Sequence, residues 1–360
     1  MAYTTSNLVI IGNGFDLAHG LKTSYGDFIK WLVEEEINNP HPDNPLFKKA
    51  RYIFESSLQS KDPSKSDKEQ LLEQIYTSSS QVHTSEFFRT LLRYSGRGEE
   101  RNWADIEGFY FRELELHLEG KIDVKKTNEE FEIIKNRFEE YLVAHTKDKK
   151  AINSYQAFFD KLHDNTLILN FNYTDTVQLY EQDKNKIVNI HGELQNPDNP
   201  MIFGYAAKEA DLDRLYEKND NQFLFNIKQN RYGDSISESR LDNFLAKAAK
   251  NEGNQGLYKG VRIFIFGHSC GISDEYILHR IVNHEKVNEI RIFYYDGIPH
   301  QHYEIRTNLK RIMNDRAQEH KIQNVHKCHR MPQCNDGKEE EKGFGEYLEE
   351  HFKFKKAAQS

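Results

Sequence analysis

The first segment whose residue types suit chemistry is Gly12-Asn13-Gly14-Phe15-Asp16, directly after an apolar run. Two glycines let a backbone turn tightly and let a ligand approach its N–H groups. The dinucleotide fingerprint is incomplete, because its third glycine falls at Leu17. The negative charge of Asp16 disfavours binding of a phosphate at this turn and favours a hydrogen bond to a ribose hydroxyl. The segment predicts a nucleotide-binding turn outside ordinary redox use, with a tight strand-to-helix connection as the alternative.

A second polar segment, Asn170-Phe171-Asn172-Tyr173-Thr174-Asp175, follows another apolar run. In doubly wound sheets, ligands bind at the carboxyl ends of the strands, so these side chains are expected near a ligand. Asn172 is suited to orient a water or a sugar hydroxyl. The alternative is that Asn and Asp here cap the following helix.

Two further turns carry histidines. Ile190-His191-Gly192-Glu193 places a histidine at a strand end, where its pKa suits a general base near neutral pH. Phe266-Gly267-His268-Ser269-Cys270-Gly271-Ile272-Ser273-Asp274 combines glycine, hydroxyl and acid after a buried strand. A helix N-cap is the alternative for this last segment. Because all four segments end predicted strands, we expect them to gather along one edge of a sheet.

Short apolar runs predict the strands that position these segments. Such runs are typical of strands buried on both faces, as in parallel sheets covered by helices. The four clear runs are residues 8–11, 166–169, 261–266 and 290–295, with 187–190 as a weaker fifth and 201–203 as a sixth candidate. Helical stretches separate them, so the predicted fold is α/β, with a doubly wound, mostly parallel, Rossmann-like sheet.

A long charged interval between the first two strands predicts a large helical insertion. We expect a core from residues 1–30 and 151–330, an insertion over 31–150 and a charged C-terminal segment over 331–360. Within the insertion, Trp103, Glu107, Tyr110 and Leu114 share one face of a predicted helix. An apolar stripe raises the pKa of a carboxyl and suits Glu107 to proton transfer. A surface salt bridge is its alternative role.

Composition narrows the class of protein. Lys and Arg number 49 against 57 Asp and Glu, and this net charge of -8 makes nucleic acid an unlikely partner. Three cysteines fit a reducing cytoplasm, and no apolar run is long enough for a signal peptide or a membrane span. Cys328, His329 and Cys334 match no common zinc spacing, so no metal is expected. The sequence does not determine whether these residues bind a ligand or whether the protein forms a homo-oligomer.

Taken together, these motifs resemble the AbiH abortive-infection family of bacterial phage-defence proteins. The resemblance rests on LVIIGNGFDLAHGLKTSYGDF at 8–28, WADIE at 103–107, NFNYTDT at 170–176, His191-Gly192 and FGHSCGISD at 266–274. AbiH proteins in turn resemble sirtuin-like NAD-binding domains. That resemblance implies a sirtuin-like fold, a nucleotide ligand, and a phage-derived trigger or partner protein.

The sirtuin-like resemblance implies NAD as substrate or ligand and hydrolysis of its N-glycosidic bond. Asn172 and His191 match catalytic positions, and Ser269 would contact the cofactor. Asp16 and Glu107 are the candidates to stabilise an oxocarbenium-like state. The remaining expected contacts are Gly12, Asn13, Gly14, Phe15, Asn170, Tyr173, Thr174, Asp175, Gly267, His268 and Asp274. A non-catalytic nucleotide sensor and a nuclease-type toxin are the alternatives.

Overall fold

The computed structural model describes residues 5–38, 103–118, 123–162, 165–207, 209–232, 236–250 and 260–352. The chain divides into two compact units. The sheet unit comprises Met1–Leu21, His145–Ile202 and Gln229–Ser360, and the helical unit comprises Lys22–Ala144 and Phe203–Lys228. Residues 203–228 thus join the helical unit, whereas the sequence boundaries had included them in the core.

Six parallel strands form the sheet, in the order β3-β2-β1-β4-β5-β6. Their bounds are β1 Ser6–Ile11, β2 Thr166–Asn170, β3 Ile187–Asn189, β4 Val261–Phe266, β5 Val287–Tyr294 and β6 His329–Arg330. In the centre, Val9 pairs with Ile168 on one side and with Phe264 on the other. The predicted α/β, doubly wound, Rossmann-like class is confirmed, and the sheet is entirely parallel.

The sixth strand is not the one that the apolar pattern predicted. Residues 201–203 form no strand, and their apolar character reflects burial of Met201 and Phe203 instead. The strand beside β5 is the two-residue β6, which no apolar run of the sequence indicates. A strand of two residues carries no periodicity that a sequence pattern could reveal.

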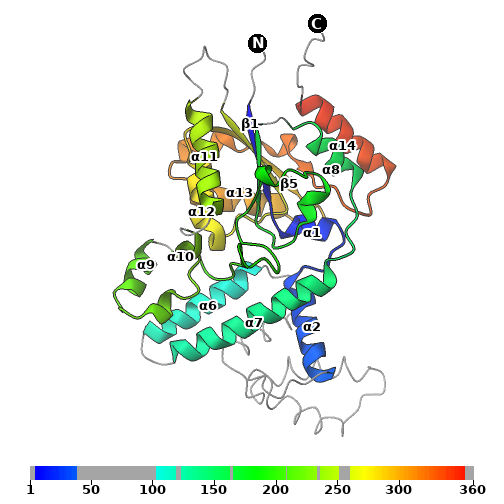
Figure 1. Ribbon diagram of the computed structural model, residues 1–360. Helices are drawn as coiled ribbons and strands as arrows, with labels where there is room; N and C mark the ends of the chain where they lie inside the picture. Colours follow the sequence, from blue (N-terminus) through cyan, green and yellow to red (C-terminus); the bar gives the residue numbers. More distant parts are fainter. Residues whose placement is uncertain are drawn as a thin grey trace. The chain divides into compact units, whose positions relative to one another are not determined.

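Alternate residues of the strands point into two hydrophobic layers, as the period of a β-strand requires. Leu8 and Ile10 face a layer with α11 (Ile236–Lys250), α12 (Glu275–Val282) and α13 (Gln301–Ile312). Val9 and Ile11 face the opposite layer, with α1 (Asn13–Ala18), α8 (Asn153–Phe159) and α14 (Lys338–His351). Figure 1 shows these helices flanking the sheet.

The predicted charged C-terminal segment includes a helix of the core. Phe344, Tyr347 and Leu348 of α14 are buried, and so is Phe352 just beyond it. Helix α14 packs beside α8 on the same face of the sheet (Figure 1). The charged residues of α14 occupy its other side, so a charged composition here marks an amphipathic helix.

The helical unit is built around aromatic side chains. Its principal helices are α2 (Tyr25–Asn38), α6 (Trp103–Leu118), α7 (Val124–His145) and α9 (Glu209–Tyr216). Phe131 lies 4.3 Å from Tyr110 and 5.0 Å from Phe203, measured between ring centroids. The predicted face of α6 is confirmed where side chains are described, because Glu107, Tyr110 and Leu114 are all buried.

Short helices complete the described elements. They are η1 Thr176–Leu179, η2 Lys184–Lys186, η3 Asn221–Leu224, α10 Lys228–Tyr232, η5 Ile272–Asp274, η6 Arg316–Lys321 and η7 Val325–Lys327. The described helices include none with the length and apolar composition needed to span a bilayer. Most of the insertion expected over residues 31–150 lies outside the described residues.

Candidate functional site

The strand order defines where a ligand is expected. Chain connections lead from β1 toward β2 and β3 on one side and resume with β4, β5 and β6 on the other, which is the Rossmann order. In such sheets ligands bind at the carboxyl ends of the strands, where the order reverses. Here that point lies between β1 and β4. The glycine turn after β1 and the Gly267 turn after β4 are therefore neighbours.

Glycines at this point let two turns of the protein meet. The amides of Gly12 and Gly14 donate to the carbonyls of Phe266 (2.9 Å) and Gly267 (2.8 Å). A Cβ on Gly12 would lie 2.6 Å from the Cα of His268, and one on Gly14 would lie 2.7 Å from the Cα of Gly267. Glycine is thus required by the protein's own backbone. These two amides are already engaged, so ligand contacts expected here would use other atoms.

Asp16 is a buried carboxyl group close to the second polar segment. Its Oδ2 accepts a 2.6 Å hydrogen bond from the hydroxyl of Thr174, and its Oδ1 accepts none from the described residues. Burial raises the pKa of Asp16 from 3.8 to about 6, with the Thr174 hydroxyl and the charge of Lys149 acting in the opposite direction. Asp16 therefore titrates close to neutral pH.

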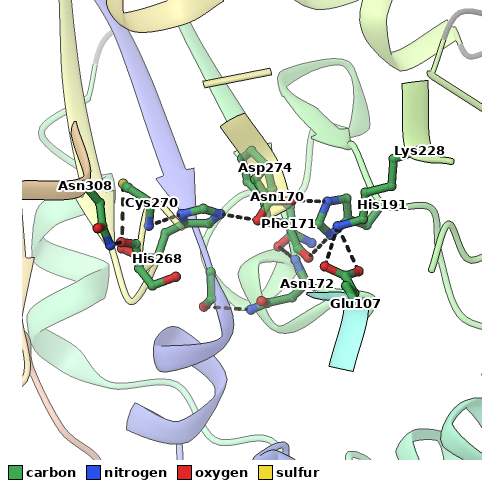
Figure 2. Close-up of polar contacts among 12 residues, drawn as sticks. Glu107, Asn170, Phe171, Asn172, His191, Lys228, His268, Cys270, Asp274 and Asn308 are labelled. Carbon is green, nitrogen blue, oxygen red and sulfur yellow. Dashed lines mark hydrogen bonds and ion pairs between the residues drawn. The ribbon is translucent and has the colours of Figure 1, made fainter. Parts of the chain in front are cut away.

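The loop after β2 is organised by Asn170. Its amide donates to the carbonyl of Thr174 (3.0 Å) and to the Asn189 side chain (2.9 Å), while its oxygen accepts from the amide of Asn172 (3.1 Å). The Asn172 side chain in turn donates to the Gly12 carbonyl at 3.0 Å (Figure 2). Asn172 is thus joined to the glycine turn, as the sequence predicted for one edge of the sheet.

Thr174 and Asp175 point to different environments. Thr174 is buried and donates to Asp16, whereas the Asp175 side chain is 61% exposed and pairs with Lys149. Asp175 precedes η1 without a side-chain cap hydrogen bond, so capping does not explain it. Of these two adjacent residues, Thr174 is the one directed toward the other candidate side chains.

Two buried histidines meet one carboxylate. His191 Nε2 lies 3.0 Å from Asp274 Oδ1, and His268 Nε2 lies 3.4 Å from Asp274 Oδ2 (Figure 2). Both rings also contact Phe171 edge-on, with centroids 5.1 and 4.3 Å away. We call His191, His268 and Asp274 the histidine cluster. Asp274 precedes α12 but makes no side-chain cap hydrogen bond, which argues against the N-cap alternative.

The turn that carries His268 is held in a strained conformation. Gly267 and Cys270 both have positive φ, 65° and 53°, and for cysteine this conformation is unfavourable. In this arrangement the amide of Cys270 donates to His268 Nδ1 at 2.9 Å. Burial raises the pKa of the Cys270 thiol, so the thiol stays neutral. The hydrogen bond from the Cys270 amide thus holds the imidazole of His268.

Three other residues that were expected to contact a ligand have partners within the sheet unit. Phe15 is fully buried in the α1 layer, 4.7 Å from the ring of Tyr155, so any ligand contact would come from its backbone. The Tyr173 hydroxyl donates to the Ile202 carbonyl at 3.1 Å. The carbonyl of Ser269 accepts from Asn308 at 3.0 Å. Asn13, Tyr173 and Ser269 remain partly exposed.

Glu107 belongs to the helical unit and forms a buried ion pair. Its carboxylate lies 2.8 Å from the Nζ of Lys228, whose side chain is 1% exposed, and it also accepts from the amide of Gly204 at 3.4 Å. Because both side chains are buried, this ion pair is not the surface salt bridge considered from the sequence, and because Lys228 pairs with it, Glu107 is not an unpaired acid. A paired carboxylate keeps its charge, so Glu107 is better suited to structure than to proton transfer.

Sequence reasoning missed several partners. Lys149 beside Asp16, Asn189 beside Asn170 and Lys228 beside Glu107 lie far from these residues in the sequence, without a motif of their own. In the part of the chain that is described, no group of three or more His, Cys, Asp or Glu forms a metal site. Cys328 donates to backbone carbonyls, and the side chain of His326 lies outside the described residues.

Fold and site together define a class: a Rossmann-ordered α/β protein with a buried carboxyl group and a histidine cluster at the carboxyl ends of its strands. The family model for bacteriophage abortive infection AbiH matches residues 8–296. The chain belongs to the AbiH family, which indicates a function in abortive infection. No curated protein and no solved structure matches the chain.

Proposed function

We propose that this protein binds NAD or a related nucleotide and hydrolyses its N-glycosidic bond as the toxic step of phage defence. The observation that carries the proposal is that Asp16, Asn172, His191 and Asp274 follow β1, β2, β3 and β4, at the carboxyl ends of these four parallel strands. Ligands of Rossmann-ordered sheets bind at this point, and the residue types are those that N-glycoside hydrolysis needs.

The reaction sets three requirements. The bond between C1′ of the ribose and N1 of nicotinamide breaks with its electron pair leaving on nicotinamide, and a water oxygen bonds to C1′. One water proton is released, so the products are nicotinamide, ADP-ribose and a proton. The transition state resembles an oxocarbenium ion, so the site needs a nearby negative charge, a positioned water and a proton acceptor.

The candidate residues meet these requirements in different ways. Asn172, tethered through its amide to Gly12, presents an oxygen suited to orient water or a ribose hydroxyl. Asp16, once ionised, supplies negative charge in a medium of low polarity, where its effect on a cation is large. The histidine cluster contains the proton acceptor. Asn13 and Ser269, both partly exposed, are the expected nucleotide contacts at the edge of this site.

The burial of His191 and its proximity to protein groups favour a second candidate function, a nucleotide sensor without turnover. Its Nδ1 lies 3.0 Å from the Phe171 carbonyl, and its Nε2 faces Asp274. In this version nucleotide binding changes the activity of a partner, such as a phage-derived protein, and NAD remains intact.

One experiment separates the two functions. Purified protein is incubated with NAD, with and without lysate from phage-infected cells, and nicotinamide is measured by chromatography. We expect release that is lost in Asn172→Ala and retained in a surface control, Lys342→Ala. If NAD stays intact but co-purifies with the protein, as shown by mass spectrometry after denaturation, the sensor is correct. Neither release nor binding would contradict both.

A further inference from the structure

The backbone of the glycine turn is not arranged to hold a phosphate. A phosphate binds where consecutive N–H groups point at the ligand. In this turn the amides of Gly12 and Gly14 donate to the two carbonyls of the β4 turn. The amide of Phe15 donates to the Gly12 carbonyl at 2.9 Å. Between Gly12 and Phe15, no two consecutive N–H groups are therefore left for an anion.

The charge beside the turn also disfavours a phosphate. Asp16 lies in the first turn of α1 and is ionised above its titration near pH 6. The charge of Lys149 lowers the pKa of Asp16, but the Nζ of Lys149 also pairs with Asp175. One cation thus serves two carboxylates. On the same helix, burial lowers the pKa of His19 to about 4, so its ring adds no positive charge at neutral pH. A phosphate at this turn would be repelled.

An uncharged hydrogen-bond donor suits the same position. Asp16 Oδ2 accepts from Thr174 at 2.6 Å, whereas Oδ1 is buried and accepts no hydrogen bond from the described residues. A buried oxygen without a donor lowers stability, so a donor from a ligand would be favourable there. Asn172 donates its nitrogen to the Gly12 carbonyl and so has its oxygen as the acceptor for a ligand. A ribose offers two neutral O–H donors, which match two acceptors.

We propose that Asp16, Asn172 and the glycine turn bind the ribose of an N-riboside, and that the phosphates of the ligand lie away from this turn. The inference rests on the proposed function and narrows its substrate class to N-ribosides with free ribose hydroxyls. Asp16 is 1% exposed, so a hydroxyl reaches its Oδ1 when the loop that follows β2 and carries Thr174 shifts. This arrangement differs from ordinary dinucleotide sites, where the pyrophosphate lies on the glycine turn.

Calorimetric titration tests the ribose assignment with ligands that cannot be hydrolysed. Benzamide riboside has a C–C bond in place of the N-glycosidic bond and carries no phosphate. We expect it to bind the wild-type protein at pH 8 about tenfold more tightly than its 2′-deoxy form, because a hydroxyl bound to a carboxylate is lost. Inorganic pyrophosphate should not displace it. Equal affinities for the two ribosides, or displacement by pyrophosphate, would overturn the assignment without the need for any variant.

Asp16→Asn gives the opposite sign for the two ligand classes. If the ribose lies at Asp16, the variant binds benzamide riboside about tenfold more weakly and loses the discrimination against the 2′-deoxy form. If a phosphate lies there, removal of the negative charge strengthens pyrophosphate binding instead, which would contradict the proposal. Asp242→Asn is the matched control, because that side chain is 54% exposed on α11. It should bind both ribosides like the wild type.

Nicotinamide release separates this inference from the proposed function. Nicotinamide riboside has no phosphate, and we expect its kcat to be within about tenfold of that for NAD, because the reacting ribose is held in the same way. Release from NAD with no binding of benzamide riboside would overturn the ribose assignment and leave the hydrolase standing. Discrimination between the two ribosides without any nicotinamide release would support the ribose site and refute hydrolysis. If no riboside binds and no nicotinamide is released, both are wrong.

Discussion

Gly14 donates a 2.8 Å hydrogen bond from its amide to the carbonyl of Gly267, so the turns after β1 and β4 are joined backbone to backbone. Both turns lie where nucleotides bind in sheets of this order. The contact therefore fixes the geometry of the candidate site, and it depends on the absence of two side chains.

Gly267→Ala is expected to destabilise the fold. Its φ of 65° is unfavourable for alanine, and the new Cβ would lie 2.2 Å from the backbone nitrogen of Phe15. The conformational term alone is about 1–2 kcal/mol, and the overlap adds to it. Urea denaturation measures the loss.

The matched control is Gly343→Ala in α14, where a Cβ meets nothing within 4 Å. That variant should gain up to about 1 kcal/mol. Equal stability of the two variants would contradict the explanation.

Stability is expected to fall in acid because of His19. Its Nδ1 donates to the Phe15 carbonyl, and its Nε2 accepts from the Tyr180 hydroxyl, both at 2.6 Å. Burial lowers the pKa of His19 from 6.5 to about 4. The neutral form is thus stabilised by folding. Its contribution is complete above pH 6.5 and is lost as pH falls toward 4, about 3 kcal/mol in total. Unfolding free energies from pH 7 to 4 test this, with His19→Gln flattening the slope.

Tyr180→Phe tests the same hydrogen-bond chain by deletion. The Tyr180 hydroxyl accepts from the Ile152 amide at 2.7 Å and donates to His19, so its removal leaves two buried groups without that partner. The expected loss is about 1–3 kcal/mol at pH 7. Tyr303→Phe, on a side chain that is 63% exposed, serves as the matched control. An unchanged denaturation midpoint for Tyr180→Phe would show that these hydrogen bonds do not contribute to stability.

Asp16→Asn should separate stability from function. Burial raises the pKa of Asp16 to about 6, so the charged form opposes folding. The contribution of Asp16 to stability is complete below pH 3.8 and is lost as pH rises through 6, by about 3 kcal/mol. The variant is therefore expected to be more stable than wild type at pH 8 and equal to it near pH 4. Nicotinamide release should fall. A less stable variant at pH 8 would show that the carboxylate is needed for folding.

The ion pair between Glu107 and Lys228 provides a double-mutant test. Replacing Lys228 by Met leaves a buried carboxylate without its cation, at an expected cost of about 3–5 kcal/mol. Replacing both residues by Met removes both charges and should recover most of that loss. Additive losses in urea denaturation would indicate that the two side chains do not interact.

The sequence predicts the sheet well because each central strand is a short apolar run buried on both faces. All five proposed strands with such runs form, and the glycine and histidine segments follow four of them. Strand β6 could not be found, because His329 and Arg330 are too few to show a pattern. The strand predicted at 201–203 does not form. Its apolar residues have another role, because Phe203 packs against Phe131 in the helical unit.

The candidate site was predictable in position and not in its contacts. Residues at the carboxyl ends of parallel strands share one edge, which places Asp16, Asn172 and His191 there. Which side chains pair depends on their directions and on residues distant in sequence. That Asp274 meets two histidines, or that Lys228 lies against Glu107, follows only from the folded chain.

The position of β1 at the centre of the sheet also determines how late in synthesis the sheet can be completed. This strand is made early, yet its neighbours are β2, which begins at Thr166, and β4, which begins at Val261. A nascent chain therefore holds Gly12 and Asp16 long before the β4 turn exists. The candidate site therefore cannot assemble on the ribosome until the chain has been made beyond β4, which places its completion late in synthesis.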